Sequence, residues 1–121
     1  MPVRTSSGSS GSSGVHVALR VRPPTSHRQC LHLNSEAASV GVTDGPTFYA
    51  EKVFGSDAQQ SEMHPFCVKT AIGRVIEGVN SAVMVYGQTG SGKTFTMEGT
   101  TEEPGVSQQA FSALFQKIRQ V

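Results

Sequence analysis

The sequence has no tryptophan, only two cysteines and no long run of apolar residues. Cys30 and Cys67 lie far apart with no Cys or His at metal-ligand spacing nearby, so we expect reduced thiols and neither a disulfide framework nor a zinc site. No apolar run approaches the roughly 18 residues of a spanning helix, so no membrane insertion is expected. The net charge of +1 provides no electrostatic case for binding nucleic acid.

Residues 1–14 differ in composition from the rest of the chain. Their Ser and Gly repeats are typical of a flexible linker or an expression tag, and a natural disordered tail is the less favoured interpretation. The remaining residues, 15–121, have the length of one small domain. We therefore predict a linker over 1–14 and a folded domain over 15–121.

A phosphate-binding loop is the strongest motif in this domain. Gly87, Gly92, Lys93 and Thr94 satisfy the pattern G-x-x-x-x-G-K-[ST]. Glycines, including Gly90, let successive backbone N–H groups point at phosphate oxygens without side-chain crowding. Lys93 supplies a positive charge for the β- and γ-phosphates, and the Thr94 hydroxyl can bind Mg²⁺ at the first turn of a following helix. The alternative without a binding function is a Gly/Ser-rich turn with an exposed lysine.

The flanks of the loop favour the phosphate-binding interpretation. Residues 81–86 form an apolar run that suits a central parallel strand buried on both faces. After Thr94, a short helix is expected to carry Phe95 and Met97. A strand before the loop and a helix after it are the context that the motif requires.

The rest of the domain alternates strand and helix patterns. Strands are expected over residues 15–22, 31–33, 40–42 and 48–54. A helix capped by Ser56 or Asp57, regular from about Pro65, should end at Gly78, and a second helix capped by Ser107 should run to Val121. Strands alternating with helices predict an α/β fold with a parallel sheet.

The residues around the loop resemble those of a kinesin motor domain. Residues 86–99 are similar to the extended loop signature of that family, and residues 20–23, 53–54 and 77–80 resemble further family segments. The resemblance covers residues 15–121 and implies a partial, truncated P-loop NTPase fold with a mainly parallel central sheet flanked by helices. Such a truncated sheet would leave apolar faces uncovered and one edge unpaired.

The resemblance also implies a nucleotide site for ATP and Mg²⁺. Arg20 and Pro23 would border the adenine, Phe95 would offer it a flat face, and Thr94 would hold the metal ion. The residues implied to wrap the phosphates are Gln88, Thr89, Gly90, Ser91, Gly92, Lys93 and Thr94. The residue pattern taken alone favours an ordinary solvated strand face for Arg20 over contact with a base.

The family hydrolyses ATP and moves along microtubules, which implies a cytoplasmic, cytoskeletal protein. Its two switch segments do not occur in this sequence, so we expect no catalytic residue here and a chain that does not hydrolyse ATP by itself. Departures from the family pattern include Ala50, Thr70 and the pair Gln108 and Gln109. The alternatives are a standalone nucleotide-binding or interaction module and an unrelated P-loop enzyme that uses GTP. Oligomeric state, cargo, direction and subfamily are not encoded in this stretch.

Overall fold

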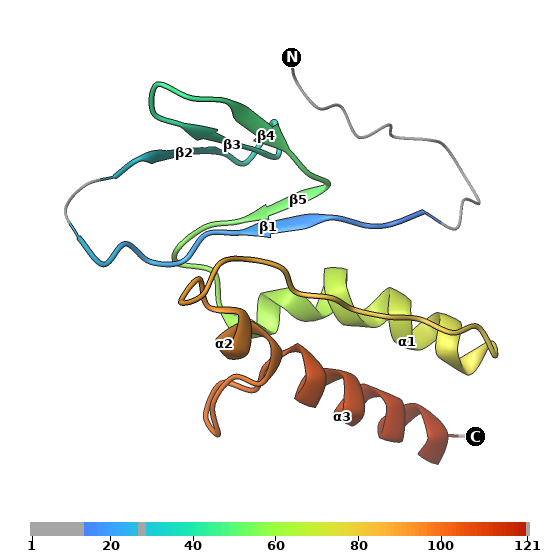
Figure 1. The fold of residues 1–121 in the computed structure, drawn as a ribbon. Coiled ribbons are helices and arrows are strands. Elements are labelled where there is room, and N and C mark those ends of the chain that lie inside the picture. Colours follow the sequence, from blue (N-terminus) through green and yellow to red (C-terminus); the bar gives the residue numbers. More distant parts are fainter. Residues whose placement is uncertain (1–13, 27–28, 121) are drawn as a thin grey trace. The chain divides into compact units, whose positions relative to one another are not determined.

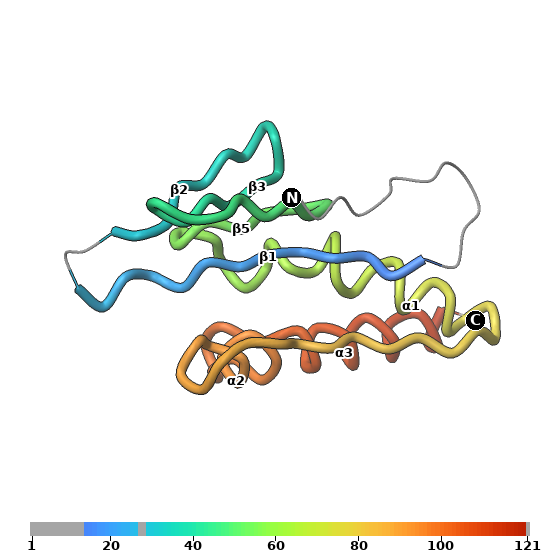
Figure 2. The backbone as a smooth tube through the Cα atoms, turned by 45° about the horizontal axis from the view of Figure 1, so that its top comes forward, coloured from blue at the N-terminus to red at the C-terminus, as the bar shows by residue number. Residues whose placement is uncertain are grey.

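The computed structural model describes residues 14–26 and 29–120 (Figures 1 and 2). The chain divides into two compact units, residues 1–58 and 59–121, and each is described by itself. The predicted linker up to residue 13 lies outside the described residues. Strands are confined to the first unit and helices to the second in the described part of the chain, a mixture consistent with a partial α/β fold of the P-loop NTPase type.

The first unit contains two small sheets. Strands β1 (Ala18–Arg20) and β5 (Lys52–Phe54) pair in parallel, with Leu19 opposite Val53. Strands β2 (Leu31–Asn34), β3 (Ser39–Val42) and β4 (Thr47–Tyr49) form an antiparallel meander. The period-two patterns at residues 31–33 and 40–42 correspond to β2 and β3, so both short strands are confirmed.

The single strand predicted over residues 48–54 is wrong. The structure breaks it at Ala50 and Glu51 into β4 and β5, which belong to different sheets. Ala50 donates its N–H to the carbonyl of Ala38, whereas Glu51 donates to Val17 beside the parallel pair, at 3.0 and 2.9 Å. Because a backbone amide pairs where an acceptor is available, long-range partners and not the local pattern decide where a strand divides.

The second unit is helical among its described residues. It consists of η1 (Gln60–Glu62), the π-helical turn η2 (His64–Val68), α1 (Lys69–Ile76), α2 (Lys93–Met97) and α3 (Val106–Arg119). Its buried apolar side chains are Met63, Val68 and Val106. Helix α3 packs against η2 and α1, and α2 contacts α3 (Figure 1).

The helical segment before the loop starts later than predicted and ends where predicted. Neither Ser56 nor Asp57 caps it: the first turn starts at Gln60, and the amide of Gln59 donates to the Glu62 carboxylate at 2.9 Å. The predicted end at Gly78 is confirmed, since Gly78 and Val79 donate their N–H groups to Val75 and Arg74. These two bonds form the Schellman arrangement that ends many helices.

The strand predicted before the phosphate-binding loop is also wrong. Residues 79–88 run back along the length of α1 as an extended segment without a partner strand among the described residues (Figures 1 and 2). Val83 and Val85 are half-buried, but Met84 and Tyr86 are 86% and 102% exposed, so only one face is covered. Exposure alternates along this segment as in a strand, but within residues 14–26 and 29–120 no neighbouring backbone supplies the ladder of hydrogen bonds that defines one.

The N-cap of the last helix lies two residues before the predicted one, Ser107. Gly105 is the N-cap of α3, and Ser107 lies inside the first turn, where its hydroxyl donates to the carbonyl of Met97 at 2.5 Å. The Ser107 side chain therefore caps the C-terminal end of α2 and does not cap its own helix. In the described part of the chain, no helix is long and apolar enough to cross a membrane. Cys30 and Cys67 form no disulfide.

Candidate functional site

The loop between residue 86 and α2 has the backbone expected of a phosphate cradle. Gly92 is the N-cap of α2 with φ of 101°, and Gly90 has φ of 81°. Residues with a Cβ atom rarely adopt these φ angles, so the conformation of the loop depends on glycine at both positions. The amide of Ser91 donates to Gln88 at 3.1 Å, which closes the turn just before the helix.

The lysine of the motif folds back over this loop. Its ammonium group donates to the carbonyl oxygen of Gly87 at 2.5 Å, so Lys93 spans the loop from its last residue to its first. Ser91, Gly92 and Lys93 are half-buried. Gln88, Thr89, Gly90, Thr94 and Phe95 are exposed. The charged group and the glycine backbone are therefore on one accessible loop.

Helix α2 is held in place by side chains from outside the loop. It has only five residues, and a helix that short is marginal without external partners for its terminal carbonyls. Gln60 donates its side-chain amide to the carbonyl of Phe95, and Ser107 donates to that of Met97, both at 2.5 Å. The amide of Gly105 donates to the carbonyl of Glu98 at 3.0 Å. The C-terminal end of α2 is thus capped from η1 and α3.

Sequence reasoning missed Gln60 and misassigned Ser107. Gln60 is polar, precedes the helical pattern and lies 35 positions from the residue it contacts. Hydrophobic periodicity carries no information about a buried glutamine. The single available signal for Ser107 was its place near a helix start, which suggested the wrong helix.

The residues expected to border the base belong to the first unit. Arg20 ends β1, and its Nη2 donates to the carbonyl of Ala58 at 3.3 Å. Pro23 follows β1 and is exposed. Gln88 to Phe95 all belong to the second unit, so the structure brings the phosphate-loop residues together but describes Arg20 and Pro23 separately from them.

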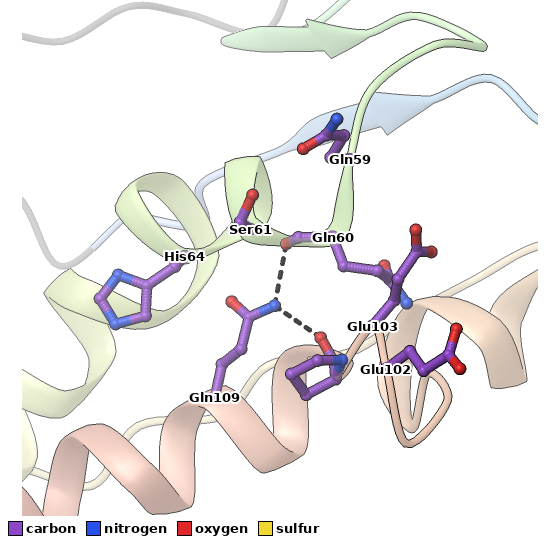
Figure 3. Close-up of a pocket in the computed structure, with 8 residues that line it drawn as sticks. Gln59, Gln60, Ser61, His64, Glu102, Glu103 and Gln109 are labelled. Carbon is purple, nitrogen blue, oxygen red and sulfur yellow. Dashed lines mark hydrogen bonds between the residues drawn. The ribbon is translucent and has the colours of Figure 1, made fainter.

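The second unit also contains a cavity of about 400 Å³ beside Gln60 (Figure 3). One side of it comes from η1 and η2, including Ser61 and His64, and the other from Glu102, Glu103 and Gln109. Its described lining contains two carboxylates and neither lysine nor arginine. A triphosphate would meet like charge there, so this cavity is no candidate for the phosphate site.

Gln109 connects the two sides of this cavity. Its Nε2 donates to the carbonyls of Gln60 and Pro104, both at 2.8 Å (Figure 3). Because only the NH₂ group can donate to two carbonyls, the orientation of the amide is determined, and its oxygen must point away from both. That buried oxygen has no hydrogen-bond partner in the part of the chain that the structure describes.

Comparison with known proteins agrees with the geometry of the loop. The sequence matches the family description "Kinesin motor domain" over residues 3–121. It is 33% identical over 116 residues to human Kinesin-like protein KIF27 and 35% identical over 117 residues to Kinesin-related protein 8 of Dictyostelium discoideum. Each alignment covers 86% of this chain but only 8% and 6% of the relative. Kinesin-like protein KIN-7I of Oryza sativa subsp. japonica is 30% identical over 109 residues, covering 88% of this chain and 9% of the relative. A family match over residues 3–121, together with relatives that are 30–35% identical over most of the chain, shows that this chain belongs to the kinesin motor-domain family.

Proposed function

We propose that residues 88–94 bind the phosphates of ATP together with Mg²⁺. The observation that carries this proposal is the closed glycine loop, in which the ammonium group of Lys93 lies over an exposed backbone and leads directly into Thr94. Lys93 contacts the β- and γ-phosphates, and the Thr94 hydroxyl is a ligand of the metal ion. The loop amides and Lys93 supply most of the attraction, because α2 is too short to contribute a large dipole.

The base lies beyond the loop in this proposal. Phe95, whose side chain follows the two phosphate-binding residues and is 41% exposed, offers its ring to the adenine. The resemblance to the family also implies Arg20 and Pro23 as residues that contact the base. Arg20 would exchange its bond to the Ala58 carbonyl for contact with the nucleotide.

The parent protein, by this proposal, is a motor that couples ATP hydrolysis to movement along microtubules in the cytoplasm. Membership in the kinesin motor-domain family supports it. The chain spans less than a tenth of the length of the relatives compared above. The groups that position water and sense the γ-phosphate are expected in the remaining motor domain, so this stretch binds nucleotide without turning it over.

Titration with a fluorescent ATP analogue and Mg²⁺ tests the site, with ATP and GTP as competitors. Lys93→Ala should weaken binding about tenfold to a hundredfold, since a hydrogen bond to a charged group contributes roughly 1.5–3 kcal/mol. Lys69→Ala, an exposed lysine at the start of α1, is the matched control and should leave the affinity unchanged. Equal affinity of the Lys93→Ala and unaltered chains would overturn the proposal.

Two further measurements separate the alternatives. Preference for GTP over ATP would contradict the assignment of ATP as the nucleotide of this site. Phosphate release by the full-length protein, stimulated by microtubules, would support the motor, whereas nucleotide binding without stimulated release would favour a standalone binding module.

A further inference from the structure

Gln60 is the most completely buried polar side chain that touches the elements of the proposed site. It is 3% exposed and lies in η1. Its Nε2 reaches the carbonyl of Phe95, while its own backbone carbonyl accepts a hydrogen bond from Gln109. A buried amide is costly unless it is hydrogen-bonded, so these contacts hold Gln60 in one position.

The contact with Phe95 falls at a particular place in α2. Lys93 and Thr94 begin this helix and are joined to the glycine loop, whereas Phe95 is its third residue. Ser107 and Gly105 cap the carbonyls of Met97 and Glu98, which lie further along. The Gln60 side chain therefore holds the backbone carbonyl of Phe95, the one aromatic residue of α2.

Loss of this contact should affect Phe95 more than the loop. The loop keeps its own bonds, from Ser91 to Gln88 and from Lys93 to Gly87. The far end of α2 keeps its caps from Ser107 and Gly105. What changes is the restraint on the backbone that aims an exposed aromatic ring, and an aromatic ring stacks well only at a defined distance and angle.

We propose that Gln60 is a positioning residue for the base of the nucleotide, which acts by fixing the Phe95 carbonyl from 35 positions away in the sequence. The proposal rests on the proposed function, because it presupposes that nucleotide binds at the loop and that the Phe95 ring faces the base. It assigns Gln60 a part in affinity for the base and none in affinity for the phosphates.

The test compares MgATP with Mg-tripolyphosphate, which carries phosphates and no base, on the whole chain. Gln60→Met keeps the length of the side chain and removes its amide. It should weaken MgATP about three- to tenfold, the effect of roughly 0.7–1.4 kcal/mol of lost restraint, and leave tripolyphosphate affinity within about twofold. Gln108→Met, at an exposed glutamine of α3, should change neither affinity.

A double-mutant cycle separates positioning from general support of the fold. Gln60→Met introduced into Phe95→Ala should produce no further loss of MgATP affinity, because the ring through which Gln60 acts is absent. A further loss equal to that in the unaltered chain would overturn the proposal. So would equal weakening of both ligands, or loss of tripolyphosphate binding, since either would give Gln60 a purely structural part.

Binding of the two ligands to the unaltered chain distinguishes failure of this proposal from failure of the proposed nucleotide site. If that chain binds neither ligand, the proposed nucleotide site is wrong and the inference falls with it. If it binds tripolyphosphate as tightly as MgATP, the phosphate cradle stands, but no base contact exists for Gln60 to position.

Discussion

At the scale of single residues, Gln109 is the clearest unsatisfied group in the described structure. Its NH₂ group makes two hydrogen bonds, while its buried oxygen makes none. An unsatisfied buried acceptor costs about 1–3 kcal/mol. The neighbouring cavity carries Glu102 and Glu103, so there is both room and opposite charge for a larger side chain that only donates.

We expect Gln109→Arg to stabilise the chain by about 1 kcal/mol. Arginine has donors for the carbonyls of Gln60 and Pro104 and no acceptor to leave unpaired. For a chain of this size the midpoint of thermal unfolding should rise by about 3–5 °C. Gln108→Arg, at the exposed neighbouring position, is the control and should change the midpoint little. A lower midpoint for Gln109→Arg would show that the cavity cannot accept the guanidinium.

At the scale of elements, the connection from α2 to α3 is a tight loop that closes on itself. Gly99 and Pro104 form an isolated antiparallel bridge, and Thr100 and Glu103 are joined by a backbone hydrogen bond of 2.9 Å. Gly99 has φ of 71°, and a Cβ atom placed there would lie 2.2 Å from the carbonyl oxygen of Glu103. Backbone on the opposite side of the loop cannot move aside as a flexible side chain can.

The same substitution should therefore have opposite effects at two glycines. Gly99→Ala should destabilise the second unit by at least 1–3 kcal/mol, because it adds a backbone clash to an unfavourable φ. Gly73→Ala, inside α1 with nothing within 4 Å of the added atom, should stabilise it by about 1 kcal/mol. Chemical denaturation of the two variants measures both effects. Equal destabilisation would contradict the described geometry of α1.

At the scale of the molecule, the second unit leaves a row of large side chains uncovered. Phe111 and Phe115 on α3 are 63% and 57% exposed, and Ile118 continues the same face one turn later. Met84 and Tyr86 are exposed on the extended segment. Apolar surface gathered in this way promotes association between molecules, in line with the uncovered faces expected from the sequence.

Replacing both rings with glutamine should raise the soluble concentration without loss of stability. Phe111→Gln with Phe115→Gln removes exposed apolar area and keeps a good helix former at each position. Light scattering across a concentration series should show less association, at an unchanged midpoint of thermal unfolding. Val106→Gln, at a buried position of the same helix, should lower that midpoint strongly. If the double variant unfolds at a midpoint as low as that of Val106→Gln, the two rings are covered in solution.

Features that depend on local chemistry could be predicted from the amino-acid sequence. The glycines and Lys93 of the loop, the end of the helix at Gly78 and the short strands β2 and β3 follow from steric freedom, capping and period-two patterns within a few residues. The same local motifs supported the family assignment, which the match over residues 3–121 confirms.

Features that need a partner elsewhere in the chain could not be predicted in this way and depend on how the chain folds. The run at residues 79–88 has strand periodicity but no paired strand among the described residues. Residues 48–54 divide because the amides of Ala50 and Glu51 find acceptors beside different sheets. Gln60 and Ser107 cap α2 from positions far along the chain. A hydrogen bond requires both of its groups in place, and a local pattern specifies only one of them.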